Sequence, residues 1–161
     1  MDQAYLTKET PMTLANPAEC PYYLISRVTL QATSAMKKGL AAAGVETVKP
    51  AYLGVLLSLW REDGLKVIEL SRKAGLEPST MTGLLDRMER DKLAYRQADR
   101  KDRRVQRIYL TSAGKDVEKP VLEVVEQVLA KMFAGVSETD VENAMNLMRQ
   151  VLANAQEEGK Q

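Results

Sequence analysis

A cluster of basic side chains near the middle of the chain is the part of the sequence with the clearest chemistry. Residues 96–107 contain six basic residues and only two acidic ones. The densest part of this cluster is Arg100, Lys101, Asp102, Arg103 and Arg104. Because lysine and arginine neutralise phosphates, and arginine also enters narrow minor grooves, this composition favours contact with duplex DNA. A solvated loop without a binding role is the alternative.

The residues that precede this cluster predict a helix with one apolar and one polar side. Four apolar residues recur at the helical period and predict the buried side: Met81, Leu84, Leu85 and Met88. The other side carries short side chains first and basic ones later: Ser79, Thr80, Thr82, Gly83, Asp86, Arg87 and Arg90. This order suits a helix that enters a major groove, where small polar groups reach base edges. A surface helix with a solvated face is the competing interpretation.

A shorter helical pattern lies immediately before this helix. Leu70 and Ala74 are four residues apart and share a helix face, and Ser71 is small enough for a second helix to cross closely. Gly75 can adopt the positive φ that a sharp turn between helices requires. The spacing therefore predicts a helix-turn-helix, although an ordinary helical hairpin has the same soft pattern.

Two segments on either side of the basic cluster predict a β-hairpin. Residues 95–98 and 105–110 read as strands, and the basic turn between them joins the two. Residues 65–67 can add a short third strand beside this hairpin. Arginines at the tip of a hairpin, next to a helix that could enter the major groove, favour DNA binding over a plain solvated loop.

At these residues the chain resembles the multiple-antibiotic-resistance regulator (MarR) family of winged helix-turn-helix repressors. The likeness rests on three stretches: Leu84-Leu85-Asp86-Arg87-Met88-Glu89, Asp99-Arg100-Lys101-Asp102-Arg103-Arg104 and Leu110-Thr111-Ser112-Ala113-Gly114-Lys115. With the length and helix order of the remaining chain, it covers roughly residues 22 to 155. Lys92 stands where the family commonly has glycine, and Val67 and Glu77 stand where it commonly has hydroxyl caps.

The resemblance implies a mostly α fold with a small β-hairpin wing, in which a winged helix-turn-helix lobe joins N- and C-terminal dimerisation helices. In a single chain of residues 1–161, the DNA-binding lobe is expected at residues 50–110 and the dimerisation region at residues 1–49 and 111–161. A homodimer would place two groove-entering helices about one DNA turn apart, roughly 34 Å, which predicts a palindromic operator. A self-contained helical core is the alternative to the dimer.

The resemblance also implies how the chain meets DNA. The helix side from Ser79 to Arg87 is expected to contact base edges and phosphates in the major groove. Arg104 is expected to reach the minor groove, with Asp102 holding its guanidinium group.

Many relatives respond to small aromatic anions, which would make the chain a ligand-responsive repressor. Arg27, Tyr52 and Trp60 could supply a cation and aromatic walls for a phenolic carboxylate. A tyrosine or tryptophan at helical spacing is otherwise part of the core.

The composition excludes several other classes of function. The chain has no histidine, which removes Ser-His-Asp and Cys-His catalytic sites and histidine-ligated metal centres. We therefore expect no enzyme, no metal and no cofactor. The net charge is only +1, so DNA binding has to rest on the segregated basic cluster. Because no apolar run has membrane-spanning length and no secretory signal is evident, a cytoplasmic protein is expected.

Two alternative functions stay open at this point. A winged helix can be a protein-interaction adaptor without specific DNA binding, although an adaptor does not need four cations at its hairpin tip. Cys20 could make the chain a redox-sensing regulator, although it is the sole cysteine and no disulfide can form within the chain. A salt titration with generic duplex DNA tests the adaptor, and peroxide treatment of Cys20→Ser tests the redox sensor.

The N-terminal half predicts an irregular segment and then two helices. Residues 1–21 contain three prolines, with four apolar residues that could lie along a partner subunit: Tyr5, Leu6, Met12 and Leu14. An apolar stripe predicts a helix over residues 22–43, which Gly44 is placed to end. Pro50 opens the next helix, which runs through Trp60 with Leu53, Leu56 and Leu57 also inward.

The C-terminal third predicts two long helices. The first is capped by Thr111 and continues to Phe133, with a bend at Pro120. The second begins after Ser137 and carries an apolar stripe of its own. Two long striped helices are more than one small domain needs, which favours dimerisation.

Overall fold

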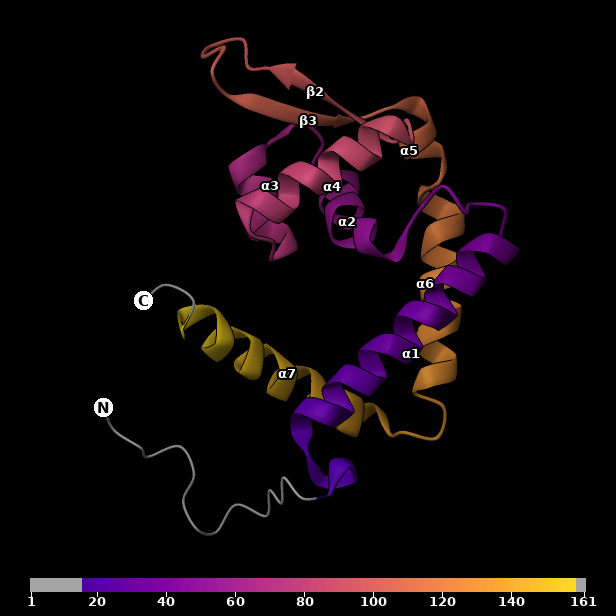
Figure 1. Ribbon diagram of the computed structural model, residues 1–161. Helices are drawn as coiled ribbons and strands as arrows, with labels where there is room; N and C mark the ends of the chain where they lie inside the picture. The colour runs from indigo at the N-terminus through magenta and orange to yellow at the C-terminus, as the bar shows by residue number, and fades with distance from the viewer. Residues whose placement is uncertain (1–15, 159–161) are drawn as a thin grey trace. The chain divides into compact units, whose positions relative to one another are not determined.

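The computed structural model describes residues 16–158, so the four N-terminal apolar residues expected to contact a partner lie outside the described range (Figure 1). The chain divides into two compact units, one ending at Val125 and the other beginning at Glu126. In chain order the elements are η1 (Pro17–Glu19), α1 (Pro21–Ala42), η2 (Pro50–Tyr52), α2 (Leu53–Arg61), β1 (Leu65–Lys66), α3 (Val67–Ala74), α4 (Pro78–Arg90), β2 (Ala94–Ala98), β3 (Gln106–Leu110), α5 (Ser112–Asp116), α6 (Glu118–Met132) and α7 (Glu138–Glu158).

The predicted fold class, mostly α with a small β-hairpin wing, is confirmed. The sheet has the strand order β1-β3-β2, and both pairings are antiparallel. Tyr95 and Tyr109 face each other across β2 and β3, and their rings stack with centroids 5.7 Å apart. Such a cross-strand aromatic pair helps to fix the register of the hairpin. The third strand next to the wing is also present, although Val67 belongs to α3 rather than to β1.

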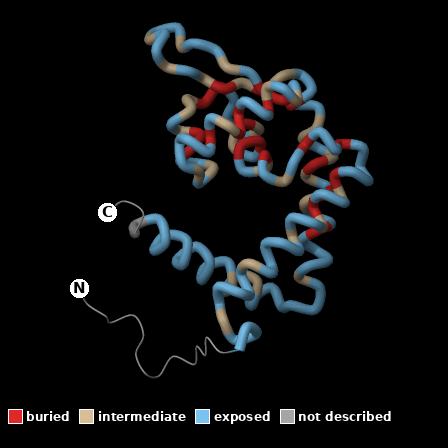
Figure 2. Tube along the Cα trace, viewed as in Figure 1, coloured by how far each residue is buried: buried red, intermediate tan, exposed pale blue. Residues whose placement is uncertain are grey.

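The core of the first unit lies where α2, α3 and α4 meet the sheet. Figure 2 shows the buried residues gathered there and toward the C-terminal end of α1. The apolar side predicted for α4 is the buried side, since Met81, Leu84, Leu85 and Met88 are all at most 3% exposed. The polar side of the same helix is consequently turned outward.

The predicted helix ends agree with the backbone. Gly75 ends α3 with a φ of 66°, and Gly44 follows α1 with a φ of 71°. Thr111 caps α5, where its hydroxyl oxygen accepts a hydrogen bond from the Gly114 amide at 3.0 Å. Ser137 accepts one from the Asp140 amide at 3.1 Å before α7. These local signals are therefore sufficient to place the ends of four helices.

Two local expectations are wrong. The helix predicted from Thr111 to Phe133 is two helices, because α5 ends at Asp116 and α6 begins at Glu118. Pro120 lies in the first turn of α6, where a missing amide hydrogen costs no helical hydrogen bond. Pro120 is therefore compatible with the start of α6 and does not bend a longer helix. Leu57, predicted to face inward, is 41% exposed on the outer side of α2.

Lys92 follows α4 with a φ of 58°, and among residues 16–158 it is the one non-glycine residue with positive φ. Because a side chain is strained there, Lys92→Gly is expected to raise the free energy of unfolding by about 1 kcal/mol. Lys38→Gly, within α1, is the matched control and should lower it by about 1 kcal/mol. Urea denaturation of both variants measures the difference, and two changes of the same sign would contradict the strain at Lys92.

Candidate nucleic-acid interface

The polar side of α4 presents short side chains over its first half. Ser79, Thr80 and Thr82 are exposed. The Thr82 hydroxyl donates to the Pro78 carbonyl at 3.0 Å, which holds its side chain against the helix. A Cβ added at Gly83 would meet only Arg87 Nη1, at 3.7 Å. The middle of this face therefore lacks bulk, as close approach to the edges of base pairs requires.

Asp99 organises the turn at the tip of the hairpin. Its carboxylate accepts hydrogen bonds from the amides of Lys101, at 2.7 Å, and Asp102, at 3.3 Å. The same carboxylate forms an ion pair with Arg107, which also donates to the Gly64 carbonyl at 2.7 Å. Hydrogen bonds from Arg107 and from the two amides lower the pKa of Asp99 to about 2. The turn is thus tied to the base of the wing.

Asp102 and Arg104 form a two-point contact at the outer edge of the turn. Arg104 Nε lies 3.1 Å from one carboxylate oxygen of Asp102, and Nη2 lies 3.2 Å from the other. The hydrogen bonds from the Arg104 side chain and amide lower the pKa of Asp102. The Arg104 side chain remains 91% exposed. Asp102 therefore orients the guanidinium group without burying it, as the family resemblance implied.

The six basic residues of the cluster divide into two groups. Arg96 and Arg107 are anchored to the protein, whereas the four others project from the exposed tip: Arg100, Lys101, Arg103 and Arg104. Within the described part of the chain, only Arg104 of these four has a carboxylate partner. The tip therefore keeps its positive charge available for phosphates.

Arg96 connects the wing to α4, a role that counting basic residues does not reveal. Its guanidinium group contacts the carboxylate of Asp86 at 2.8 Å and that of Glu89. It also donates to the Thr82 carbonyl at 3.2 Å, and its amide donates to Glu89 at 2.8 Å. The one signal in the sequence was a pair of carboxylates, three residues apart, on an otherwise basic helix. They need a cation, and β2 supplies it.

The contacts of Asp99 lead to a pH-dependent prediction. A carboxyl group with a lowered pKa stabilises its surroundings above its ordinary value, here 3.8, and this contribution is lost as the pH falls through about 2. Asp99→Asn should remove it at every pH. We expect the amides of Lys101 and Asp102 to lose most of their hydrogen-exchange protection in this variant. In the wild type the same loss should occur only toward pH 2.

Asp102→Asn is the control for this experiment, because it removes the Arg104 contact and leaves the Arg107 ion pair in place. Protected turn amides in Asp99→Asn at pH 7 would show that another contact holds the wing.

The three residues proposed for effector binding lie on three separate elements, α1, η2 and α2. Arg27 is exposed on α1. The Trp60 indole nitrogen donates to the Gly114 carbonyl at 2.9 Å. Tyr52 is buried, and its hydroxyl group donates to Asp91 at 2.8 Å. Each aromatic residue thus has a structural hydrogen bond that joins separate elements.

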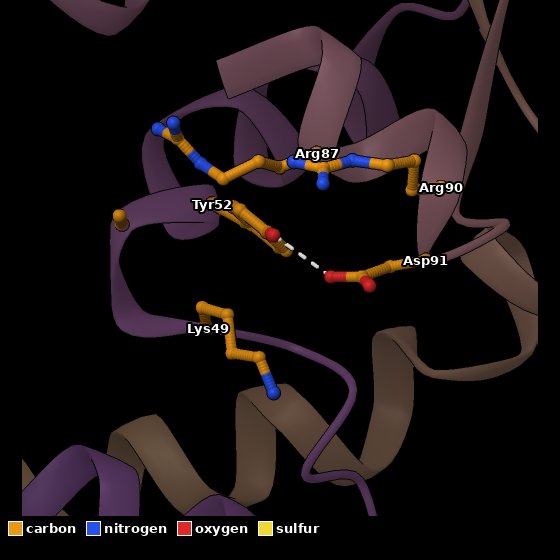
Figure 3. Close-up of a pocket in the computed structure, with 6 residues that line it drawn as sticks. Lys49, Tyr52, Arg87, Arg90 and Asp91 are labelled. Atoms are coloured by element: carbon orange, nitrogen blue, oxygen red, sulfur yellow. Dashed lines mark hydrogen bonds between the residues drawn. The ribbon is translucent and has the colours of Figure 1, made fainter. Parts of the chain in front are cut away.

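Tyr52 lines a pocket of about 340 Å³ beside α4, here called the η2–α4 pocket, whose other lining residues are Lys49, Ala51, Arg87, Arg90 and Asp91 (Figure 3). Burial raises the pKa of the Tyr52 hydroxyl, and the hydrogen bond and negative charge of Asp91 raise it further. Arg87 and Arg90 act in the opposite direction on the same group. The positive charges of Arg87 and Arg90 therefore act on the Tyr52 hydroxyl group in the pocket lining.

Three further observations concern the other kinds of site considered from the sequence. No group of three or more acidic, cysteine or histidine side chains between residues 16 and 158 is arranged to hold a metal ion. Cys20 is half-buried at the start of α1, where its carbonyl accepts from the Leu24 amide. Over the same residues, no helix has the length and apolar character that crossing a membrane requires.

Comparisons with known proteins agree with this geometry. The MarR family model matches residues 50–105. The HTH-type transcriptional repressor MdtR of Bacillus subtilis is 32% identical over 114 residues, which are 71% of this chain and 74% of MdtR.

Two solved structures extend the likeness to most of the chain. The PcaV transcriptional regulator of Streptomyces coelicolor, in complex with its natural ligand, superposes with a TM-score of 0.80 at 22% identity, over 89% of this chain and 99% of PcaV. Reduced AbfR bound to DNA superposes with a TM-score of 0.69 at 26% identity, over 92% and 99% of the two chains. Both share the fold of this chain.

Proposed function

The chain belongs to the MarR family of transcriptional regulators, and from this membership we propose that it is a ligand-responsive repressor that binds a palindromic operator as a homodimer. As a member of that family it is a winged-helix, DNA-binding regulator of transcription. The negative sign of regulation has support from MdtR, which is a transcriptional repressor. The DNA contacts, the dimer and the ligand are our proposals.

The observation that carries the proposal is the pairing of two surfaces in the first unit. The short-chained face of α4 and the basic tip at residues 99–105 are linked through Arg96, which fixes the wing against the helix. One surface has the chemistry to reach base edges and the other has the chemistry to reach phosphates and a narrow minor groove. AbfR, of the same fold, has been solved bound to DNA.

The proposed dimer has support from apolar side chains that a single chain leaves exposed. On α1, Tyr22 is 80% exposed, and Ile25 and Val28 are each more than half exposed. On α7, Leu147 and Leu152 are also more than half exposed. Stripes of this kind favour association, and a twofold dimer presents the same stripe on both subunits. Sedimentation at micromolar concentration tests the dimer directly.

The operator can be found without knowing the regulated genes. Genomic fragments captured by the purified protein should share an inverted repeat whose half-sites lie about one DNA turn apart. A salt series with the enriched sequence and with random duplex then separates specific binding from phosphate attraction. Equal affinity for both at every salt concentration would favour the adaptor alternative and would reject the proposal.

The proposed effector is a phenolic carboxylate, with Arg27, Tyr52 and Trp60 as its contacts. PcaV, which has the same fold, was solved with its natural ligand. Such a ligand would weaken DNA binding by favouring a lobe spacing that does not fit the operator. We expect millimolar salicylate to give measurable heat in calorimetry and to release the wild-type protein from its operator. Absence of both effects would reject this class of ligand.

A further inference from the structure

The η2–α4 pocket has a charge pattern of which the proposed DNA contacts use only Arg87. Three cations and one carboxylate line it: Lys49, Arg87, Arg90 and Asp91. Figure 3 shows the two arginine side chains along one side, Lys49 on the opposite side, and the hydrogen bond between Tyr52 and Asp91 between them. The lining therefore carries an excess of positive charge around a hollow.

Neither arginine is neutralised by a residue that the structure describes. In the part of the chain that the structure describes, neither Arg87 nor Arg90 has a carboxylate within ion-pair distance, and the recorded side-chain bond of Arg90 is from Nε to the Asp86 carbonyl at 3.4 Å. The Lys49 ammonium group donates to the Glu46 carbonyl, which leaves two further hydrogens. Asp91 is held by Tyr52 at 2.8 Å. Two guanidinium groups consequently keep free donors beside the pocket.

We propose that the η2–α4 pocket binds one oxyanion, a phosphate or carboxylate group, through Arg87 and Arg90 with Lys49 opposite. Guanidinium groups form paired, charge-assisted hydrogen bonds to such groups, and the buried Tyr52 ring gives the pocket an apolar wall. The pocket is open, so a single charged group fits without full desolvation.

The oxyanion can come from two sources with the same chemistry. A backbone phosphate of the operator could occupy the pocket, which would extend the contacts of α4 along one strand. A free small anion could occupy it instead, and would then compete with DNA for the two arginines. The DNA source rests on the proposed function, whereas a free anion in this pocket would share only Tyr52 with the contacts proposed for the phenolic effector.

The first arm of the test uses the full-length protein without DNA. Inorganic phosphate and benzoate are titrated at low ionic strength while the Nε–H resonances of the arginines are followed by NMR. We expect saturable shifts at Arg87 and Arg90, and at least about tenfold weaker binding in the variant Arg87→Gln/Arg90→Gln. Arg72→Gln, which removes an exposed arginine of α3 outside the pocket, is the matched control and should bind as the wild type does.

The second arm replaces the operator phosphates one at a time with neutral methylphosphonates. If a DNA phosphate occupies the pocket, a methylphosphonate at one position in each half-site should weaken binding of the wild type and of Arg72→Gln. The same replacement should have little effect on binding of the double variant. Saturable binding in the first arm identifies a free anion, and a position of this kind in the second identifies the DNA.

A negative result in both arms overturns the proposal and leaves the arginines to stabilise the C-terminal end of α4. Retained operator binding in that case would separate this failure from failure of the proposed function.

Discussion

Gly114→Ala is expected to lower the free energy of unfolding by about 3 kcal/mol, because the added methyl group would overlap backbone atoms. A Cβ at this position would lie 2.0 Å from the Leu93 carbonyl oxygen and 3.0 Å from the Leu93 carbonyl carbon. The contact is with backbone, which cannot rotate away as a side chain can. That backbone is also held in place, because the Leu93 oxygen accepts from the Thr111 amide at 3.1 Å.

Gly83→Ala is the matched control for this substitution. It places the same methyl group in α4, where the nearest atom is the end of the flexible Arg87 side chain, so it should stabilise the fold by about 0.5–1 kcal/mol. Urea denaturation monitored by circular dichroism measures both variants. A Gly114→Ala protein as stable as the wild type would show that α5 can move away from the Leu93 backbone.

The features that the sequence predicted correctly depend on residues close together in the chain. The apolar period of α4, the turn at Gly75 and the cap at Thr111 each follow from a few neighbouring residues, and each agrees with the structure. The two hairpin strands were also placed within one residue. Gly114 belonged to the stretch that carried the family resemblance. The structure explains why a glycine stands there, because the backbone of Leu93 leaves no room for a Cβ.

The features that the sequence did not predict depend on which distant residues meet. Arg96 and Arg107 looked equivalent to the arginines at the tip, and only the folded chain pairs them with α4 and with Asp99. The outward position of Leu57 and the break after Asp116 likewise depend on packing between elements. The η2–α4 pocket joins residues about forty positions apart, from Lys49 to Arg90, which no local pattern reveals.

Because Arg96 is anchored to the protein and the tip residues are not, replacing them should affect stability and DNA affinity differently. Replacing Arg96 leaves Asp86 and Glu89 without their cation and loosens the wing, so stability and DNA affinity should fall together. Replacing a residue at the tip removes no contact that holds the fold, so only DNA affinity should fall. Arg104 is the tip residue with the largest expected effect, because Asp102 orients it in advance.

Arg104→Ala is expected to weaken operator binding by about 1–3 kcal/mol while leaving the melting temperature of the protein unchanged. The loss follows from removing a guanidinium group that a narrow minor groove attracts, and the unchanged stability follows from its 91% exposure. Asp102→Ala should show the same effect at smaller size, because the arginine remains but loses its two-point contact. Fluorescence anisotropy with operator and random DNA, across a salt series, measures both variants.

Arg100→Ala and Thr82→Ala are the controls that give this series its meaning. Arg100 is proposed as a phosphate contact, so Arg100→Ala should weaken binding to operator and random DNA alike. It should also reduce the slope of log affinity against log salt concentration by about one unit. Thr82 lies on the short-chained face of α4, so Thr82→Ala should relax the preference for particular bases. The salt dependence should change little, because the lost hydroxyl group carries no charge. Arg104→Ala should instead lose more affinity for the operator than for random DNA. If it binds the operator as tightly as the wild type at every salt concentration, Arg104 does not lie in the minor groove and the role assigned to the wing is wrong.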